Sequence, residues 1–184
     1  MNKHHTKVLE EVKTYPEYKL IERYYGSQIA ERSGVEKMNH INEGIIILDS
    51  IEASIQAKKA YCLHPLLQSD VDLKINYRRE IHTYKEEDRI DFQSIVMAME
   101  YRAVANAYLS QKGINSIDEI KLSPLRDVNN MLIADKIQNY KDFMKYHEYE
   151  HDRKRELFSY FHNWFEALNI TTSAERLVNI IKEY

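Results

Sequence analysis

Apolar residues recur at α-helical spacing over most of this chain, with polar residues between them. In the stretch 92–111, for example, Ile95, Met99 and Ala103 fall on successive helical turns. The same pattern predicts helices over residues 17–32, 38–51, 54–67, 92–111, 124–146, 148–168 and 174–182, after a short amphipathic segment at 6–12. Pro65 is expected to interrupt or end the helix 54–67, because proline has no N–H for the helical ladder, and a polar turn follows at 69–72.

Composition supports an all-α chain. Its 184 residues are 43% hydrophobic, enough for a substantial core, and include only four glycines and three prolines, which is few for a turn-rich sandwich or barrel. No Pro/Gly/Ser-rich linker divides the chain, so residues 1–184 are expected to form a single all-α domain.

Charge and cysteine content narrow the possible partners. The net charge of −3 gives no overall attraction to nucleic acid or to an anionic membrane. No apolar run is long enough to cross a bilayer, and the N-terminus has no apolar segment of the signal-peptide kind. Cys62 is the only cysteine, so no intrachain disulfide can form, which fits a cytoplasmic location. A homo-oligomer remains possible.

The segment 131–143 carries the most informative chemistry. Asp135 sits within an apolar helical run, and Asn139 follows one turn later on the same face. A carboxylate in such a run is costly unless it is paired or binds a metal. His40 and His64 lie in similar apolar settings on two other predicted helices. Together His40, His64 and Asp135 predict a metal site built from three helices.

The local contexts of these residues have a family likeness. Arg32, Ser33 and Gly34 lead to His40, and His64 closes an Ala/Leu-rich helix. The third motif is Ala134-Asp135-Lys136-Ile137-Gln138-Asn139, followed by a Lys-Asp pair. Over roughly residues 20–145 this order resembles the HD-type metal phosphohydrolases, in the branch of SpoT/Mesh-like (p)ppGpp hydrolases, and residues 146–184 would add C-terminal helices.

The resemblance implies a fold, a cofactor and roles for particular residues. It implies an HD-type helical bundle in which His40, His64 and Asp135 hold a divalent ion such as Mn²⁺. The same resemblance implies that the substrate, a nucleotide or alarmone, is met by further side chains. Those side chains are Arg32, Ser33, Lys136 and Asn139.

One position departs from the family pattern. The family follows its second histidine with a metal-binding Asp, where this chain has Pro65, and it places a Glu-Asp pair shortly afterwards, where this chain has Gln68 and Ser69. Gln68 and the neighbouring Asp70 are therefore the candidates for handling the attacking water. Glu43, one turn after His40, or Asp70 could replace the missing ligand.

Two hypotheses follow. In the first, the chain is a working metal-dependent nucleotide phosphohydrolase with a rebuilt site, in which an ion activates water for attack on phosphorus and Lys136, Arg32 or Arg102 offsets phosphate charge. In the second, it is a catalytically inactive HD-like protein that binds a nucleotide or a protein partner.

Other motifs compete with this interpretation. His147-Glu148-Tyr149-Glu150-His151 matches the H-E-x-x-H zinc-protease signature, but the charged stretch that follows it is typical of a solvated helix face. No Gly-rich phosphate loop of the P-loop or Rossmann kind occurs. Cys62 and His64 are two residues apart and do not face each other on a helix, which argues against a thiol nucleophile.

Two helices carry residues whose expected role is mainly structural. Arg102 and Asn106 could line the pocket, but core packing with a local ion pair is favoured. Core packing or a helix–helix contact is likewise favoured for an aromatic stripe near the C-terminus. That stripe consists of Phe158, Phe161, Trp164, Phe165 and Leu168.

Overall fold

Helices account for nearly all of the regular structure. The computed structural model describes residues 3–31, 33–76, 89–109, 116–146 and 152–182, and within them confirms the all-α prediction. Its helices are α1 (Lys3–Val12), α2 (Pro16–Tyr25), α3 (Met38–Ser50), α4 (Ile55–Gln68), α5 (Asp70–Asn76), α6 (Phe92–Ala107), the 3-10 turn η3 (Ile117–Glu119), α7 (Arg126–Tyr146), α8 (Lys154–Ala167) and α9 (Ala174–Lys182).

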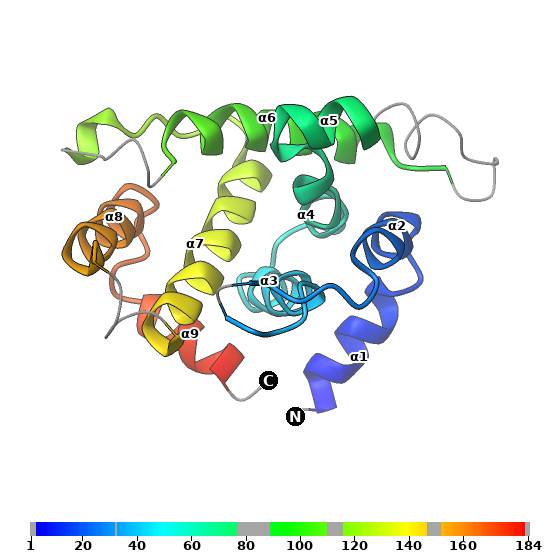
Figure 1. Cartoon of the computed structure of the whole chain (residues 1–184), viewed down its shortest axis with the longest axis horizontal. Coiled ribbons are helices and arrows are strands. Elements are labelled where there is room, and N and C mark those ends of the chain that lie inside the picture. Colours follow the sequence, from blue (N-terminus) through cyan, green and yellow to red (C-terminus); the bar gives the residue numbers. More distant parts are fainter. Residues whose placement is uncertain (1–2, 32, 77–88, 110–115, 147–151, 183–184) are drawn as a thin grey trace.

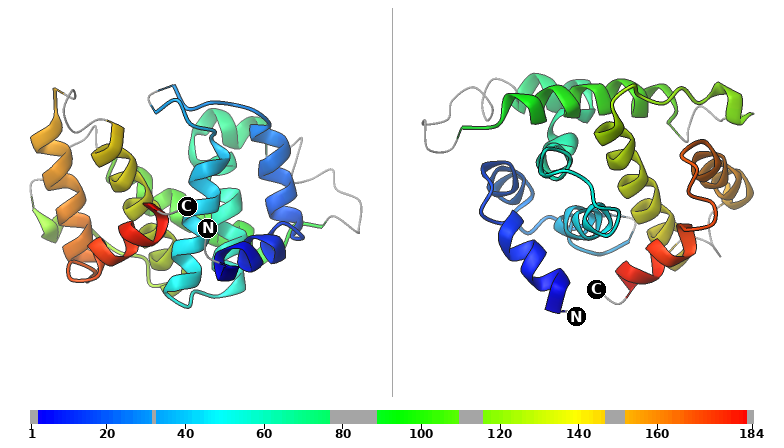
Figure 2. Two further views of the ribbon diagram at one scale, coloured as in Figure 1. Left: turned by 90° about the horizontal axis from the view of Figure 1, so that it is seen from below. Right: turned by 180° about the vertical axis from the view of Figure 1, so that it is seen from behind.

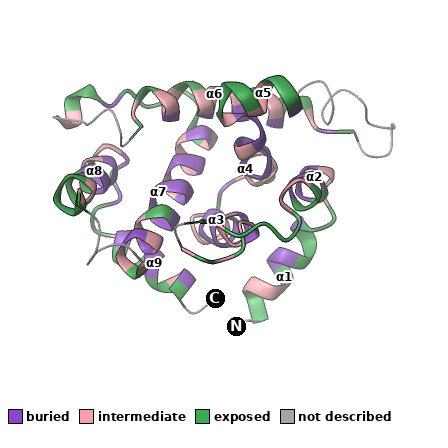
Figure 3. Cartoon of the chain, viewed as in Figure 1, coloured by how far each residue is buried: buried purple, intermediate pink, exposed green. Residues whose placement is uncertain are grey.

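The helices pack around α3, α4 and α7. In Figure 1, α6 crosses one end of the molecule with α5 beside it, and α7 runs away from α6 toward α9. Helices α1 and α2 flank α3 and α4 on one side, and α8 and α9 flank α7 on the other (Figure 2). Buried positions concentrate on the faces that α3, α4 and α7 turn toward one another (Figure 3). The three helices that carry the predicted metal ligands are therefore the innermost ones.

Helix α2 is shorter than predicted. It ends at Tyr25, whereas the sequence predicted a helix as far as residue 32, because Gly26 adopts a positive φ of 49° that leaves the helical ladder. The chain then doubles back, with an isolated antiparallel bridge between Ile29 and Glu36. Gly34, at a φ of 70°, makes the return turn. The doubled-back segment carries Ser33 to the edge of the site.

Helix α4 continues through its proline. The sequence predicted a break near Pro65, yet α4 runs to Gln68 with Pro65 inside it. Ser54 caps its start by accepting the N–H of Ala57 at 3.0 Å. The predicted polar turn at 69–72 is also wrong, because a new helix, α5, begins at Asp70, with Ser69 accepting the N–H of Asp72 at 2.9 Å.

Three other boundaries differ from the prediction. Helix α6 ends at Ala107 and not at residue 111, and α7 begins at Arg126 and not at Pro124. The predicted helix 148–168 begins, in the described part of the chain, at Lys154. Each difference lies at a helix end, where the apolar periodicity that located the helix carries little information.

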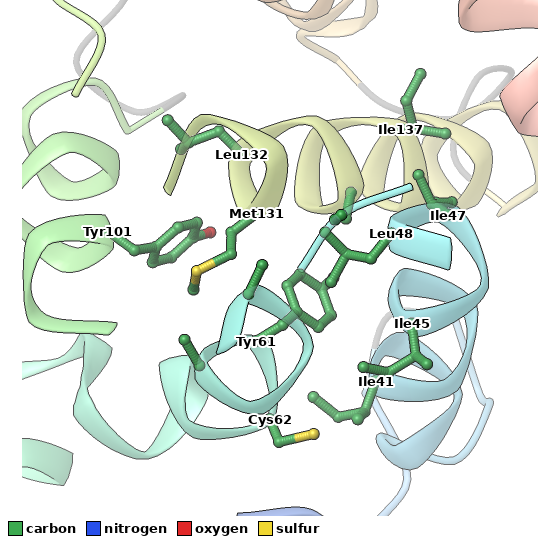
Figure 4. Close-up of a cluster of buried hydrophobic side chains, with 14 of the residues drawn as sticks. Ile41, Ile45, Ile47, Leu48, Tyr61, Cys62, Tyr101, Met131, Leu132 and Ile137 are labelled. Carbon is green, nitrogen blue, oxygen red and sulfur yellow. The ribbon is translucent and has the colours of Figure 1, made fainter. Parts of the chain in front are cut away.

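The core close to the predicted site holds Tyr61 of α4 against α3 (Figure 4). The ring of Tyr61 occupies the space in which a side chain at Gly44 would start, since a Cβ placed there overlaps Tyr61 ring atoms. Ile41 and Met131 surround the same region. Gly44 therefore allows α3 and α4 to approach closely where His40 and His64 meet.

No helix in the described part of the chain has the length and apolar character of a membrane span.

Candidate metal centre

The three predicted ligands meet at one point. His40 comes from the first turn of α3, His64 from the buried face of α4 and Asp135 from the middle of α7. Their ligand atoms all lie within 4.8 Å of one another. His40 Nε2 is 3.2 Å from His64 Nε2 and 3.8 Å from Asp135 Oδ1. Among the described residues, these three are the one group of His, Cys, Asp or Glu side chains close enough together to share a metal ion.

An amide fixes the orientation of His40. Gln138 Nε2 donates to Glu43 Oε2 at 3.0 Å and to Asp142 Oδ2 at 2.8 Å, so the amide oxygen must be on the opposite side. That oxygen lies 2.6 Å from His40 Nδ1. Because an amide oxygen only accepts, His40 Nδ1 carries a proton, and in the neutral ring the lone pair is on His40 Nε2.

A backbone carbonyl fixes His64 in the same way. His64 Nδ1 lies 2.6 Å from the carbonyl oxygen of Tyr61, which can only accept, so the lone pair of His64 is also on Nε2. With both rings neutral, two lone pairs face each other across 3.2 Å, an arrangement that is repulsive unless a cation or a proton lies between them. The hydroxyl of Tyr61, 3.3 Å from His40 Nε2, is the nearest protein donor.

A proton is a poor occupant of this position on the His64 side. Burial, assisted by the neighbouring His40, lowers the pKa of His64 from 6.5 to about 3. At neutral pH His64 is thus held neutral, which is the form that binds metals. The hydrogen bond from a metal-binding histidine's other nitrogen to a carbonyl oxygen is typical of metal centres.

Asp135 is held as a carboxylate. Its Oδ1 accepts from Asn139 Nδ2 at 2.8 Å and its Oδ2 from Lys136 Nζ at 2.9 Å. Burial alone would raise the pKa of Asp135, but the Lys136 ammonium, with smaller contributions from His40 and His64, outweighs this effect and lowers the pKa to about 2. Lys136 is itself buried, 4.9 Å from the ring centre of Trp164 and 5.6 Å from that of Tyr160. Despite that burial, the Asp135 carboxylate raises the pKa of Lys136.

The donor set fits a divalent transition ion. Ligand atoms about 2.1 Å from an ion are separated by roughly 3.4 Å in tetrahedral and 3.0 Å in octahedral geometry. The two separations from His40 Nε2, 3.2 and 3.8 Å, are close to these values, and all three ligand atoms lie within 4.8 Å of one another. Two imidazoles and one carboxylate suit Zn²⁺, Mn²⁺ or Fe²⁺ and leave coordination positions for water or substrate.

The three ligands open onto a cleft of about 470 Å³ between α3, α4, α7 and α8. Four of the residues predicted to act near the ion line it, and these are Ser33, Gln68, Lys136 and Asn139. The opposite wall is largely apolar and aromatic, with Leu157, Tyr160 and Phe161 from α8. The cleft thus combines a polar wall beside the ligands with a wall that can hold a flat ring.

Other predicted site residues lie elsewhere. Asp70 does not line the cleft: its side chain is 92% exposed and pairs with Arg102 at the surface, because α5 turns it outward. Arg102 is thus used in a local ion pair, and Asn106 donates to the carbonyl oxygen of Gln68 at 2.8 Å, in agreement with the structural roles favoured for both. Arg32 lies outside the described residues.

Glu43 supports the cluster from behind. It is 3% exposed and accepts from Lys141 Nζ at 2.7 Å, from Gln138 and from Asn39. The sequence proposed Glu43 as a replacement ligand, but its carboxylate is engaged in this network and is outside the converging group. The Gln138 amide links Glu43 to His40.

The sequence reasoning missed Gln138, Lys141 and Tyr61. A signal for the first two existed: with Asp135 they form a polar series along the buried face of α7, spaced by single helical turns. Tyr61 gave no such signal, because it contributes its backbone carbonyl to His64, and any residue type would provide one.

The H-E-x-x-H segment 147–151 lies outside the described residues. Cys62 is buried, and burial raises the pKa of its thiol, which argues against a nucleophilic role. In the aromatic stripe, Trp164 and Phe165 are fully buried in the core while Phe158 is 44% exposed.

Comparison of the chain with protein-family models, curated proteins and solved structures gives no match.

Proposed function

We propose that the protein is a metal-dependent nucleotide phosphohydrolase of the HD type, with (p)ppGpp-like nucleotides as the first substrates to test. The observation that carries this proposal is that His40 Nε2 and His64 Nε2, the atoms that bear the lone pairs of the neutral rings, lie 3.2 Å apart beside a buried carboxylate held in its ionised form. Such an arrangement is repulsive without a cation and favourable around one.

The proposed division of labour follows the walls of the cleft. His40, His64 and Asp135 hold the ion, which when bound polarises phosphoryl oxygens and makes water more acidic. Ser33 and Asn139 line the polar wall and are placed to donate hydrogen bonds to phosphate oxygens. Tyr160 and Phe161 offer ring faces to a nucleobase.

A second function is favoured by one specific observation. The cleft wall nearest His64 carries Pro65 and Gln68, neither of which has a carboxylate to accept a proton from water. Asp142, another carboxylate that lines the cleft, is engaged by Lys141 at 2.7 Å and by Gln138. A protein that binds metal and nucleotide without hydrolysis is consistent with this wall.

Metal analysis separates both functions from a purely structural cluster. The purified protein is dialysed against Mn²⁺ or Zn²⁺ and its bound metal is measured, beside His40→Asn and the matched control His162→Asn on the exposed face of α8. We expect about one ion per chain in the native protein and the control, and loss of it in His40→Asn. A native protein that binds no metal would overturn both proposed functions.

A phosphate-release screen then separates the hydrolase from the binding protein. Pyrophosphate and phosphate release are measured with (p)ppGpp and the common nucleotides in the presence of Mn²⁺. We expect turnover that disappears in His40→Asn and persists in His162→Asn. Metal and nucleotide binding without release for any compound would replace the hydrolase with the binding function.

A further inference from the structure

Helix α4 carries a proline at the position that follows a predicted metal ligand. Pro65 lies inside the helix, which continues to Gln68. A proline in the interior of a helix destabilises it, because it has no N–H and its ring crowds the carbonyl one turn earlier. That carbonyl belongs to Tyr61, four residues before Pro65, so the helix supplies it with no i→i−4 donor.

The carbonyl left free by the proline has a different partner. The side chain of His64 turns back and its Nδ1 lies 2.6 Å from the Tyr61 oxygen, in a fully buried setting. This bond places the His64 proton on Nδ1 and directs its Nε2 at His40 Nε2, 3.2 Å away. The missing helical bond and the orienting bond therefore use the same acceptor.

We propose that Pro65 is a positioning residue for His64. By withholding a backbone N–H from the Tyr61 carbonyl, it reserves that oxygen for His64 Nδ1 and fixes the ring in the form whose Nε2 binds the ion. This inference rests on the proposed metal site. It gives Pro65, which replaces the carboxylate implied by the family resemblance, a role in the geometry of the remaining ligands.

The variant Pro65→Ala tests the proposal, because alanine restores an N–H aimed at the Tyr61 carbonyl and leaves the ligands intact. The first readout is the ¹⁵N signals of the His64 ring in metal-free protein, assigned with His64→Gln. We expect a single form of the His64 ring in the native protein, with the proton on Nδ1 and none on Nε2. In the variant we expect a mixture of forms with the proton on either nitrogen. An Nε2-protonated His64 in the native protein, or unchanged ring signals in the variant, would overturn the proposal.

The second readout separates positioning from packing. We expect the metal affinity of Pro65→Ala to fall about 10- to 100-fold, while its metal-free melting temperature rises by about 5 °C as the helix gains a hydrogen bond. Loss of both stability and affinity with unchanged ring signals would show that Pro65 only fills space.

A matched control and the order of measurements keep the outcomes distinct. Pro16→Ala removes a proline from the first turn of α2, where no helical bond is missing, and should change neither metal affinity nor the His64 signals. If the native protein binds no metal, the proposed function fails, yet the ring signals of native protein and Pro65→Ala still decide whether Pro65 sets the ring form. A variant that does not fold leaves the native His64 spectrum as the deciding measurement.

Discussion

The buried charges of Asp135 and Lys136 show how single residues make this site possible. Neither charge is stable alone in a core, but they lie 2.9 Å apart and both are less than a tenth exposed. The Lys136 ammonium also lies over the Trp164 ring at 4.9 Å. The carboxylate therefore keeps its charge in metal-free protein, and Lys136 compensates that charge.

The pairing of Asp135 with Lys136 predicts that one substitution, Lys136→Met, lowers the stability of the metal-free protein and increases its stabilisation by Mn²⁺. In Lys136→Met the buried carboxylate loses its partner, so the free energy of unfolding of metal-free protein should fall by about 3 kcal/mol or more. Added Mn²⁺ should stabilise the variant more than the native protein, because the ion then provides the missing positive charge. Urea unfolding with and without Mn²⁺ measures both effects.

Lys58→Met is the control for this prediction. Lys58 pairs with Asp49 at 2.7 Å, at a site where the Asp49 side chain is 20% exposed, so its loss should cost less and should not increase the response to Mn²⁺. Equal Mn²⁺ stabilisation of Lys136→Met and native protein would contradict the assigned role of Lys136.

His64 makes the stability of metal-free protein depend on pH. Its pKa is about 3 in the folded chain against 6.5 for an unperturbed histidine, so between these values the unfolded chain binds a proton that the folded chain does not. The free energy of unfolding should therefore fall as pH drops from about 6.5 toward 3, by at most about 1.4 kcal/mol per pH unit from this group. Asp135, at about 2 against 3.8, adds a loss in the same direction below pH 3.8.

Urea unfolding at several pH values in the presence of a chelator measures this slope. His64→Gln should flatten it between pH 6.5 and 4, and His162→Gln on the exposed face of α8 should leave it unchanged. A native protein whose stability is constant across that range would contradict a buried neutral His64.

At the scale of elements, the contact of α3 with α4 depends on Gly44. Helix propensity alone predicts that Gly44→Ala inside α3 stabilises the protein by about 1 kcal/mol. The structure predicts the opposite sign, because the new methyl group would overlap the Tyr61 ring, and overpacking costs about 1–3 kcal/mol. Thermal unfolding of Gly44→Ala decides between the two.

A second variant identifies the cause of that loss. In Tyr61→Leu the ring is absent, so adding Gly44→Ala to it should cost less than adding Gly44→Ala to native protein. Equal costs in the two backgrounds would mean that the methyl group meets something other than Tyr61.

The helices were largely predictable from sequence, and their ends were not. Apolar periodicity located α3, α6 and α7, since each packs one continuous face into the core. It failed at two residues. Helix α4 continues through Pro65, with buried residues around it, and α2 stops at Gly26, a residue type that commonly ends helices and through which the prediction extended the helix. The conflict at Pro65 is decided by packing, which the sequence does not display.

The candidate site was predictable in its residues and not in its supports. Asp135 stood out as a charge among apolar residues, and the resemblance pointed to His40 and His64. The hydrogen bonds that orient them come from Gln138 and from the Tyr61 carbonyl, and these depend on how α4 and α7 are rotated against α3. Helical spacing defines a face, but it does not determine that rotation.

Across the whole molecule, a layer of polar side chains separates two cavities. The cleft beside the ligands holds Asp142, and a cavity of about 910 Å³ on the other side, between α3, α7 and α9, is lined by Glu43 and Lys141. Gln138 connects the two sides of this layer, since its amide donates to Glu43 on the cavity side and to Asp142 on the cleft side. The Glu43–Lys141 pair thus joins α3 to α7 directly behind the ligand cluster.

That pair predicts a strong coupling between its members. Both side chains are about 3–4% exposed and lie 2.7 Å apart, so Lys141→Met leaves the Glu43 carboxylate buried without its cation and should cost about 3 kcal/mol or more. Glu43→Leu should cost less, because Lys141 keeps its pair with Asp142 at 2.7 Å. The double variant replaces the pair with apolar groups of similar volume and should recover much of the stability lost in Lys141→Met, although Asp142 also loses its cation, at a site where its side chain is 21% exposed. A double-mutant cycle by urea unfolding measures the coupling, and additive losses would contradict it.

The same double variant separates stability from ligand orientation. Asp142 still accepts from Gln138 at 2.8 Å when Glu43 is gone, so the amide oxygen should still face His40 Nδ1. Metal affinity should therefore stay within a few-fold of the native value once stability is recovered. A large loss of affinity in a stable double variant would mean that the pair itself sets the distance between α3 and α7 at the ligands, and that Gln138 alone does not hold His40 in place.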